Sequence, residues 1–191
     1  MVSKRVVIVG ISGVGKTTLV SHIVRILESR NRTVSVVSFG TLMFKKAREL
    51  GVSDRDALRR LPTEQQQRLQ VDAASMISQM QEDVVIVDTH SFISTPSGFY
   101  PGLPEYVLKV IRPSNFISVT AMPEEIYNRR MNDPTRQRDI ISISAIKKEM
   151  AVQDAMLSTC SVLSGSPLKS VMNSEGKIQE AAQAAIDAIG L

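Results

Sequence analysis

One short segment limits the fold of this chain more than any other, the run Gly10–Thr17 with the sequence GISGVGKT. It fits the pattern G-x-x-x-x-G-K-[ST] at every fixed position. The apolar run Val6–Val9 precedes it, and a stretch with helical periodicity follows it, which is the strand–loop–helix context that the motif requires. Its glycines allow successive N–H groups to turn toward a phosphate, and a helix N-terminus adds partial positive charge. The segment therefore predicts a phosphate-binding loop in a parallel α/β fold.

The loop has a defined expected role in binding ATP together with Mg²⁺. Lys16 is expected to reach the β- and γ-phosphates, and the Thr17 hydroxyl to bind the metal ion. Asp88 ends the apolar run Val84–Val87, and a carboxylate in that position orients Mg²⁺ or its bound water. The residues expected to bind ATP are consecutive: Gly10, Ile11, Ser12, Gly13, Val14, Gly15, Lys16, Thr17 and Thr18.

Strand-like and helix-like segments alternate along the chain, which is typical of a parallel sheet with helices on both faces. Short runs rich in Val and Ile predict five buried strands at 5–9, 34–39, 84–87, 116–120 and 168–172. Helices are predicted at about 17–30, 54–60, 64–81, 104–111, 123–132, 143–163 and 177–189, with capping boxes at Ser53 and Thr63. The 191 residues thus predict one domain with a three-layer α/β fold of the P-loop NTPase type and a five-stranded parallel sheet.

Two stretches are longer than this alternation needs. About 45 mostly helical residues separate the second and third strands, and the polar run 132–139 lies between the fourth and fifth. Such insertions at the carboxyl ends of parallel strands commonly hold substrates.

Four arginines, Arg129, Arg130, Arg136 and Arg138, lie within ten residues in or beside the polar run. Guanidinium groups suit forked contacts with phosphate and keep their charge at any working pH. A loop that carries them could close over the site and exclude water during phosphoryl transfer. For Arg129 and Arg130, a solvated helix end with ion pairs to Glu125 or Asp133 is an equal alternative.

Several other functions are disfavoured. The chain lacks an Asn-Lys-x-Asp motif, and Asp88-Thr-His-Ser is not the Asp-x-x-Gly of a GTPase switch. The net charge of +4 is spread over scattered basic residues, and only 4% of residues are aromatic, so small anionic ligands explain it better than a nucleic acid. Cys160 is the only cysteine and is expected to pack in a helix. We find no apolar run of about 18 residues and no leader sequence, so we expect a cytoplasmic protein without a membrane partner.

Taken together, the motifs resemble those of the archaeal adenylate kinases, and the resemblance runs the length of the chain. It includes Gly10–Thr17, Phe39–Thr41, Asp54–Asp56 with Arg59, Asp88–His90, Thr95–Pro104 and Thr135–Asp139. The Thr95–Pro104 string, with Asp-Thr-His before it, is specific to this family, whereas many families share the phosphate loop.

The resemblance implies reversible phosphoryl transfer from ATP to AMP, an AMP-binding insert at about 40–82, a short lid at about 131–141 and a homotrimer. It places Gly40, Thr41 and Arg59 near AMP, and Arg136 and Arg138 in the lid. We expect His90 either to contact substrate or to pack near the site. The expected catalytic residues are Lys16, Arg129, Arg136 and Arg138.

Two departures affect the acceptor site. Bacterial and eukaryotic adenylate kinases carry an arginine on the helix after the second strand, where this chain has Phe44, Lys45 and Lys46. They also have Gly-Phe-Pro-Arg after the third strand, where this chain continues Thr89–Phe92. Arg59 is therefore our candidate for the contact with the AMP phosphate.

Two alternative functions remain open at this stage. One is a kinase for a different nucleoside monophosphate, because nothing in the sequence reads the base directly. The other is an adenylate-kinase-like ATPase that acts as an assembly factor, which the lid arginines disfavour.

Overall fold

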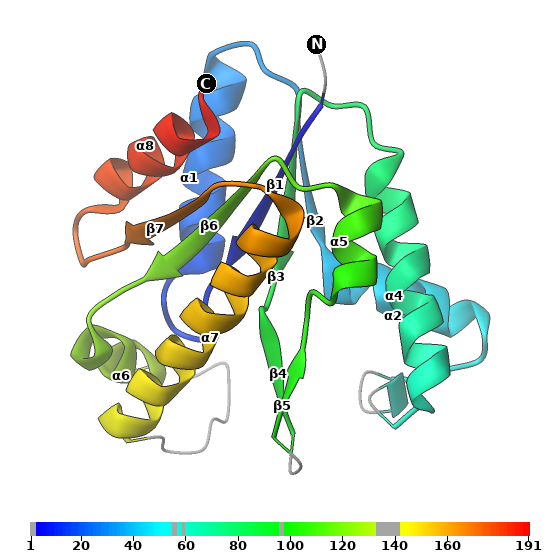
Figure 1. Cartoon of the computed structure of the whole chain (residues 1–191). Helices are drawn as coiled ribbons and strands as arrows, with labels where there is room; N and C mark the ends of the chain where they lie inside the picture. The colour runs from blue at the N-terminus through cyan, green and yellow to red at the C-terminus, as the bar shows by residue number, and fades with distance from the viewer. Residues whose placement is uncertain (1–2, 55–56, 59, 96–97, 133–141) are drawn as a thin grey trace.

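The computed structural model describes residues 3–54, 57–58, 60–95, 98–132 and 142–191 (Figure 1). At its centre lies a five-stranded sheet with the order β2-β3-β1-β6-β7, and every pairing is parallel. The strands are β1 (Lys4–Val9), β2 (Val34–Ser38), β3 (Val84–Thr89), β6 (Asn115–Thr120) and β7 (Leu168–Met172). All five predicted strands are confirmed, with ends that differ by two residues or fewer.

Helices cover both faces of the sheet, which gives the three layers seen in Figure 1. On one face lie α1 (Lys16–Ser29) and α8 (Ile178–Ile189), and on the other lie α2 (Phe39–Glu49), α4 (Thr63–Ser78), α5 (Glu105–Ile111) and α7 (Ile143–Ser164). The short helix α6 (Pro123–Met131) packs beside α7.

The central strand β1 consists mainly of Val and Ile because both of its faces are buried. Val6 and Ile8 belong to the core cluster under α1 and α8, whereas Val7 and Val9 belong to the cluster on the opposite face. Successive side chains of a strand point to opposite faces, so a strand covered on both sides is apolar throughout. The carboxyl end of β1 is thereby held rigidly at the point where the phosphate loop begins.

Two elements were not predicted. The helix α2 follows β2 directly; its N-cap residue is Ser38, a residue type common at this position, although the Ser38 side chain makes no capping hydrogen bond. The other is a hairpin of β4 (Phe92–Thr95) and β5 (Gly98–Pro101), which pair antiparallel. The hairpin projects from the carboxyl edge of the sheet, between α7 and the α2–α4 region (Figure 1).

The predicted capping boxes are wrong in detail. Pro62 is the N-cap of α4, Thr63 is already helical, and no side chain caps this end. Gln66 instead donates from Nε2 to the Leu61 carbonyl oxygen at 2.8 Å. At the other segment Asp54, rather than Ser53, accepts the capping bond, from the Ala57 N–H at 2.7 Å. The backbone of Pro62, with φ −52° and an extended ψ of 144°, marks the start of α4.

The structure describes the two insertions to different extents. The helix α4 and all but the first residue of α2 fall within the predicted insert 40–82, and the two helices pack against each other. Most of the predicted lid, 133–141, lies outside the described residues, and the chain is described again from Ser142, whose hydroxyl caps α7. None of the helices within the described ranges is long and apolar enough to cross a membrane.

Candidate active site

The loop after β1 has the backbone conformation that phosphate binding needs. Gly13 and Gly15 adopt φ angles of 89° and 81°, in the left-handed region that favours glycine. Gly15 is the N-cap of α1, so the first turn of this helix opens toward the loop. Thr17 and Thr18 are exposed at that turn. The N–H groups and the positive end of the helix dipole therefore meet at one place.

A buried lysine and a carboxylate lie together beside the loop. Lys16 Nζ is 2.6 Å from Asp88 Oδ1 and donates to the Thr89 carbonyl oxygen at 2.5 Å. Burial lowers the pKa of the Lys16 amine, and the charge and hydrogen bond of Asp88 partly offset this. Sheet register accounts for the proximity, because Ile8, two residues before the loop, pairs with Asp88 on the neighbouring strand. A cation and a carboxylate thus stand ready at the carboxyl edge of the sheet.

The arginines at the end of α6 contact the phosphate loop. Arg129 donates from Nη1 to the Val14 carbonyl oxygen at 3.2 Å and from Nη2 to the Asn173 carbonyl oxygen at 3.0 Å. Arg130 donates from Nε to the Ser12 carbonyl oxygen at 2.8 Å, and its side chain is only 7% exposed. The alternative of a solvated helix end is therefore wrong for Arg130. Arg129 does form the expected ion pair with Glu125, at 3.7 Å, in addition to its contact with the loop.

A cavity of about 370 Å³ opens on the other side of the loop. It lies between the loop, α2, the start of the hairpin and α7. Its lining comprises Ile11, Ser12, Gly40, Met43, Leu58, Gln66, His90, Ser91, Phe92, Ile93, Glu149 and Gln153. A smaller cavity of about 150 Å³ shares Gly40 and His90 with it and reaches Lys16 and Asp88. The fold thus brings six of the predicted residues to two cavities that share lining residues: Ile11, Ser12, Lys16, Gly40, Asp88 and His90.

Among the predicted residues of the substrate site and lid that have not yet been placed, the structure describes only Thr41. Thr41 is exposed on the first turn of α2, next to Gly40. Arg59, Arg136 and Arg138 lie outside the described residues.

Polar side chains that the sequence patterns did not reveal also line the cavity. Ser91 is 3% exposed, and its Oγ has no hydrogen-bond partner within the described part of the chain. Gln153, on α7, is 2% exposed and donates from Nε2 to Ser118 Oγ at 3.0 Å. Ser91 directly follows the predicted residue His90, so its position in the chain was a signal, whereas Gln153 belongs to no local motif and reaches the site only through tertiary packing.

The hairpin is fixed to the site at its base. The Gly102 N–H donates to the Ser91 carbonyl oxygen at 2.9 Å. A Cβ atom on Gly102 would lie 2.1 Å from the His90 carbonyl oxygen, so only glycine fits there. This close approach gives a structural reason for one glycine in the Thr95–Pro104 string: the chain after β5 passes directly against the backbone that carries His90.

The donor atoms of the site suit a hard divalent cation such as Mg²⁺. The Thr17 hydroxyl and the Asp88 carboxylate are both oxygen ligands, the kind that Mg²⁺ prefers. Lys16 connects these two residues, because it directly precedes Thr17 in the sequence and its amine contacts the Asp88 carboxylate. The described residues hold no cluster of three or more His, Cys, Asp or Glu side chains for a metal ion.

Comparisons with known proteins agree with this geometry. A family model described as "AAA domain" matches residues 9–147. A curated adenylate kinase from Thermoplasma acidophilum is 43% identical over 188 residues, covering 98% of this chain and 99% of the relative. A curated adenylate kinase from Methanocaldococcus jannaschii is 39% identical over 191 residues, covering 99% of this chain and 100% of the relative.

Solved structures show the same fold at low sequence identity. A shikimate kinase from Acinetobacter baumannii in complex with shikimate superposes with a TM-score of 0.61 at 12% identity, covering 98% of this chain and 93% of that one. A shikimate kinase from Bacteroides thetaiotaomicron gives a TM-score of 0.59 at 14% identity, covering 98% and 99%. At these identities the likeness concerns the fold alone.

Proposed function

The chain belongs to the archaeal adenylate kinase family and is a phosphotransferase, and we propose in detail how its residues move phosphate from ATP to AMP to give two ADP. One observation supports the details best. Lys16 and Asp88 lie at the end of the phosphate loop, and the smaller cavity extends from them to Gly40 and His90. Donor and acceptor sites are therefore adjacent, as direct transfer requires.

On the donor side, the N–H groups between Gly10 and Thr18 bind the ATP phosphates. The Lys16 amine pairs with Asp88 in the free protein and would shift its contact to the β- and γ-phosphates once ATP is bound. Thr17 and Asp88 would hold Mg²⁺, which when bound neutralises the charge on the phosphate oxygens. Until the nucleotide arrives, the ion pair with Asp88 keeps the Lys16 amine at the end of the loop.

On the acceptor side, AMP occupies the cavity beside α2. Gly40 and His90, which line both cavities, would contact it together with Thr41, and Arg59 would bind its phosphate. No general base is needed, because the AMP phosphate is already an anionic nucleophile. The cavity wall has the role of orienting that phosphate in line with the bond that breaks.

Arginines stabilise the charge that spreads over the moving phosphoryl group. Arg136 and Arg138 reach it from the lid, and Arg129 from the end of α6, where Nη1 lies 3.7 Å from the position that a Cβ on Gly15 would take. The insert at about 40–82 and the lid at about 131–141 are the parts that we assign to substrate binding. A homotrimer in the cytoplasm completes the proposal.

An acceptor panel tests this proposal. ADP formation from Mg·ATP is measured with AMP, CMP, UMP or GMP and without any acceptor. We expect rapid ADP formation with AMP alone. A faster reaction with another monophosphate would make the chain a kinase for that nucleotide. Hydrolysis at the same rate without acceptor would contradict phosphoryl transfer and favour an ATPase.

A further inference from the structure

The carbonyl oxygens of the phosphate loop are held by side chains from distant parts of the chain. Ser12 O accepts from Arg130 Nε at 2.8 Å, and Val14 O accepts from Asn173 Nδ2 at 2.8 Å. These partners are 118 and 159 residues away in the sequence. Arg130 comes from the end of α6, and Asn173 directly follows β7. Two alternate carbonyls of the loop are therefore fixed from outside the motif.

Each of these two side chains is itself well anchored. Arg130 forms an ion pair with Glu149 of α7 through Nη2 at 2.7 Å. Asn173 is 4% exposed, and its N–H donates to the Thr120 carbonyl oxygen at 2.7 Å. The Asn173 carbonyl oxygen accepts from Arg129. Because both groups are buried and paired, they can hold a definite position rather than follow the loop.

Close packing against the loop glycines supports this arrangement. A Cβ atom on Gly15 would lie 2.5 Å from Asn173 Nδ2, and one on Gly13 would lie 3.0 Å from Arg130 Cγ. Any larger residue would push the two side chains away. The glycines therefore serve the approach of Arg130 and Asn173 as well as the left-handed backbone.

The physical consequence concerns the direction of the peptide groups. A phosphate loop works when its N–H groups point inward, and this orientation turns carbonyls outward, where they need donors. Buried donors that are already in place satisfy those carbonyls before ATP arrives. The loop then needs little rearrangement on binding, and preorganised donors are the stronger ones.

We infer that Arg130 and Asn173 are positioning residues of the phosphate loop, which hold the Ser12 and Val14 carbonyls outward and keep the N–H groups ready for the phosphates of the donor. Neither residue has to touch ATP. Glu149 orients Arg130 from the far side, although it also lines the larger cavity. The inference rests on the proposed function only in taking a nucleoside triphosphate as the ligand of the loop.

Calorimetric titration of the full chain with ATP, and separately with AMP, tests this inference. Arg130→Lys keeps the charge opposite Glu149 but loses the fork that reaches both partners. Asn173→Ala removes the amide donor. We expect each to raise the Kd for ATP about 10-fold or more, because a buried hydrogen-bonded contact is lost, and to change the Kd for AMP less than about 2-fold. Glu149→Gln, which keeps a hydrogen-bonding group beside Arg130, should raise the Kd for ATP less than Arg130→Lys.

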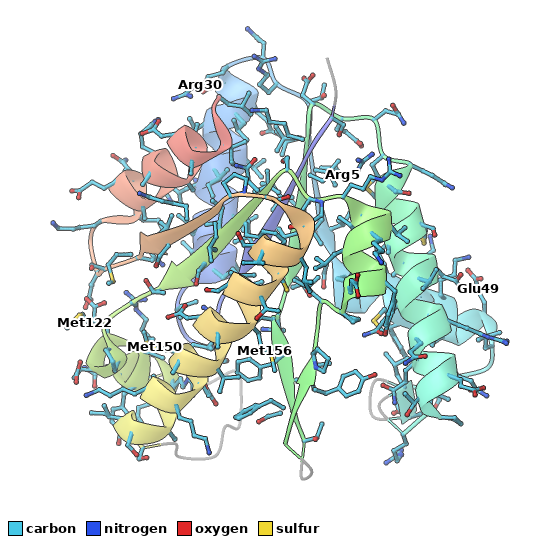
Figure 2. All side chains as sticks on the ribbon, in the orientation of Figure 1. Arg5, Arg30, Glu49, Met122, Met150 and Met156 are labelled. Atoms are coloured by element: carbon cyan, nitrogen blue, oxygen red, sulfur yellow. The ribbon has the colours of Figure 1, made fainter. Side chains whose placement is uncertain are left out.

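A matched control is Arg30→Lys. Arg30 also donates to a backbone oxygen, from Nη1 to Leu191 O at 3.0 Å, but it follows α1 at the end opposite the loop (Figure 2). This variant should bind ATP like the wild type.

Kinetics separate positioning from catalysis and from general stability. In Arg130→Lys the KM for ATP should rise while kcat at saturating ATP stays within about 3-fold, because bound ATP restores the loop. An unchanged Kd for ATP in both Arg130→Lys and Asn173→Ala would overturn the inference. So would an equal loss of ATP and AMP binding, which indicates a structural role. ATP binding needs no acceptor, so a wild type that fails to phosphorylate AMP would refute the proposed function and leave this comparison intact.

Discussion

The donor and acceptor sides of the site are built in different ways. On the donor side, the loop and Lys16 are held by hydrogen bonds from α6, β3 and the end of β7. On the side that we assign to the acceptor, the larger cavity has no Lys or Arg among its described lining residues, and Glu149 is the one carboxylate among them. The arginines that we assign to the acceptor and the lid lie outside the described segments. The fold therefore prepares a place for the donor phosphates, whereas we assign acceptor recognition to side chains of the insert and lid.

The largest expected effect lies on the donor side. Lys16→Ala should lower kcat at least about 100-fold, because it removes a preorganised charge that follows the phosphates into the transition state. Steady-state kinetics at saturating substrates measure this loss, and the melting temperature checks that the variant folds. Lys109→Ala, an exposed lysine paired with Glu105 on α5, is the control and should keep full activity. A near-normal kcat for Lys16→Ala would contradict the assignment of the loop.

Variants of the lid arginines test whether the donor and acceptor sides act together in phosphoryl transfer. At least one of Arg136→Ala and Arg138→Ala should lose about 100-fold or more in kcat, while calorimetric dissociation constants for ATP and AMP change little. The reason is that these contacts strengthen only as charge spreads over the moving phosphoryl group. Wild-type turnover in both variants would mean that the donor side binds ATP without a transferring lid, and an ATP-dependent binding protein would then explain the site better.

A variant of Arg59 tests whether AMP binding can be weakened without a change in ATP binding. Arg59→Ala should raise the KM for AMP by about 10- to 150-fold and leave the KM for ATP nearly unchanged, since a guanidinium–phosphate contact contributes about 1.5–3 kcal/mol. Bisubstrate kinetics give both constants in one experiment. Equal effects on both substrates would show that Arg59 stabilises the insert and does not bind the acceptor.

A smaller effect should appear at the base of the hairpin, through stability. Gly102→Ala places a methyl group against the His90 carbonyl, and overpacking of this kind costs about 1–3 kcal/mol. For a chain of this length, we expect the melting temperature to fall by about 5 °C in thermal unfolding. The matched comparison is Gly40→Ala, where the added methyl meets nothing within 4 Å and should not lower the melting temperature. An unchanged melting temperature for Gly102→Ala would show that the hairpin can move away from His90.

We expect the buried thiol of Cys160 to take no part in either the donor or the acceptor side of the site. It is 6% exposed, its Sγ contacts the Leu103 carbonyl oxygen, and burial raises the pKa of the thiol to about 11. At pH 8 only about one thiol in a thousand is then ionised, so iodoacetamide should label the folded chain at least about 100-fold more slowly than the unfolded one, as followed by mass spectrometry. Because the folded thiol keeps its proton while the unfolded thiol loses it, stability should fall as the pH rises from about 9 to 11. Fast labelling of active protein at pH 8 would show that the thiol is accessible.

The elements that the sequence predicted well are those specified by local patterns. The five strands follow from runs of Val and Ile, and α1 follows from the phosphate motif and its apolar spacing. The helix α2 was missed because it follows β2 with no break, so that the predicted strand 34–39 took in Phe39, its first helical residue. The hairpin was missed because its strands are only four residues long. Thr63 was assigned a capping role because it heads a capping-box pattern, although the extended Pro62 before it sets the helix start.

By itself, the sequence determined the phosphate loop, the succession of strands along the chain and the resemblance to a family, because each of these is written in consecutive residues. Only the tertiary structure decided that Arg130 and Asn173 hold the loop carbonyls, that Ser91 and Gln153 line the cavity, and that Gly102 lies against His90. These contacts join residues from different elements, and parallel strands bring their carboxyl ends to one edge whatever their separation in the chain. Local periodicity sets which face of an element is buried, but the partner that it meets there depends on how the whole sheet is ordered.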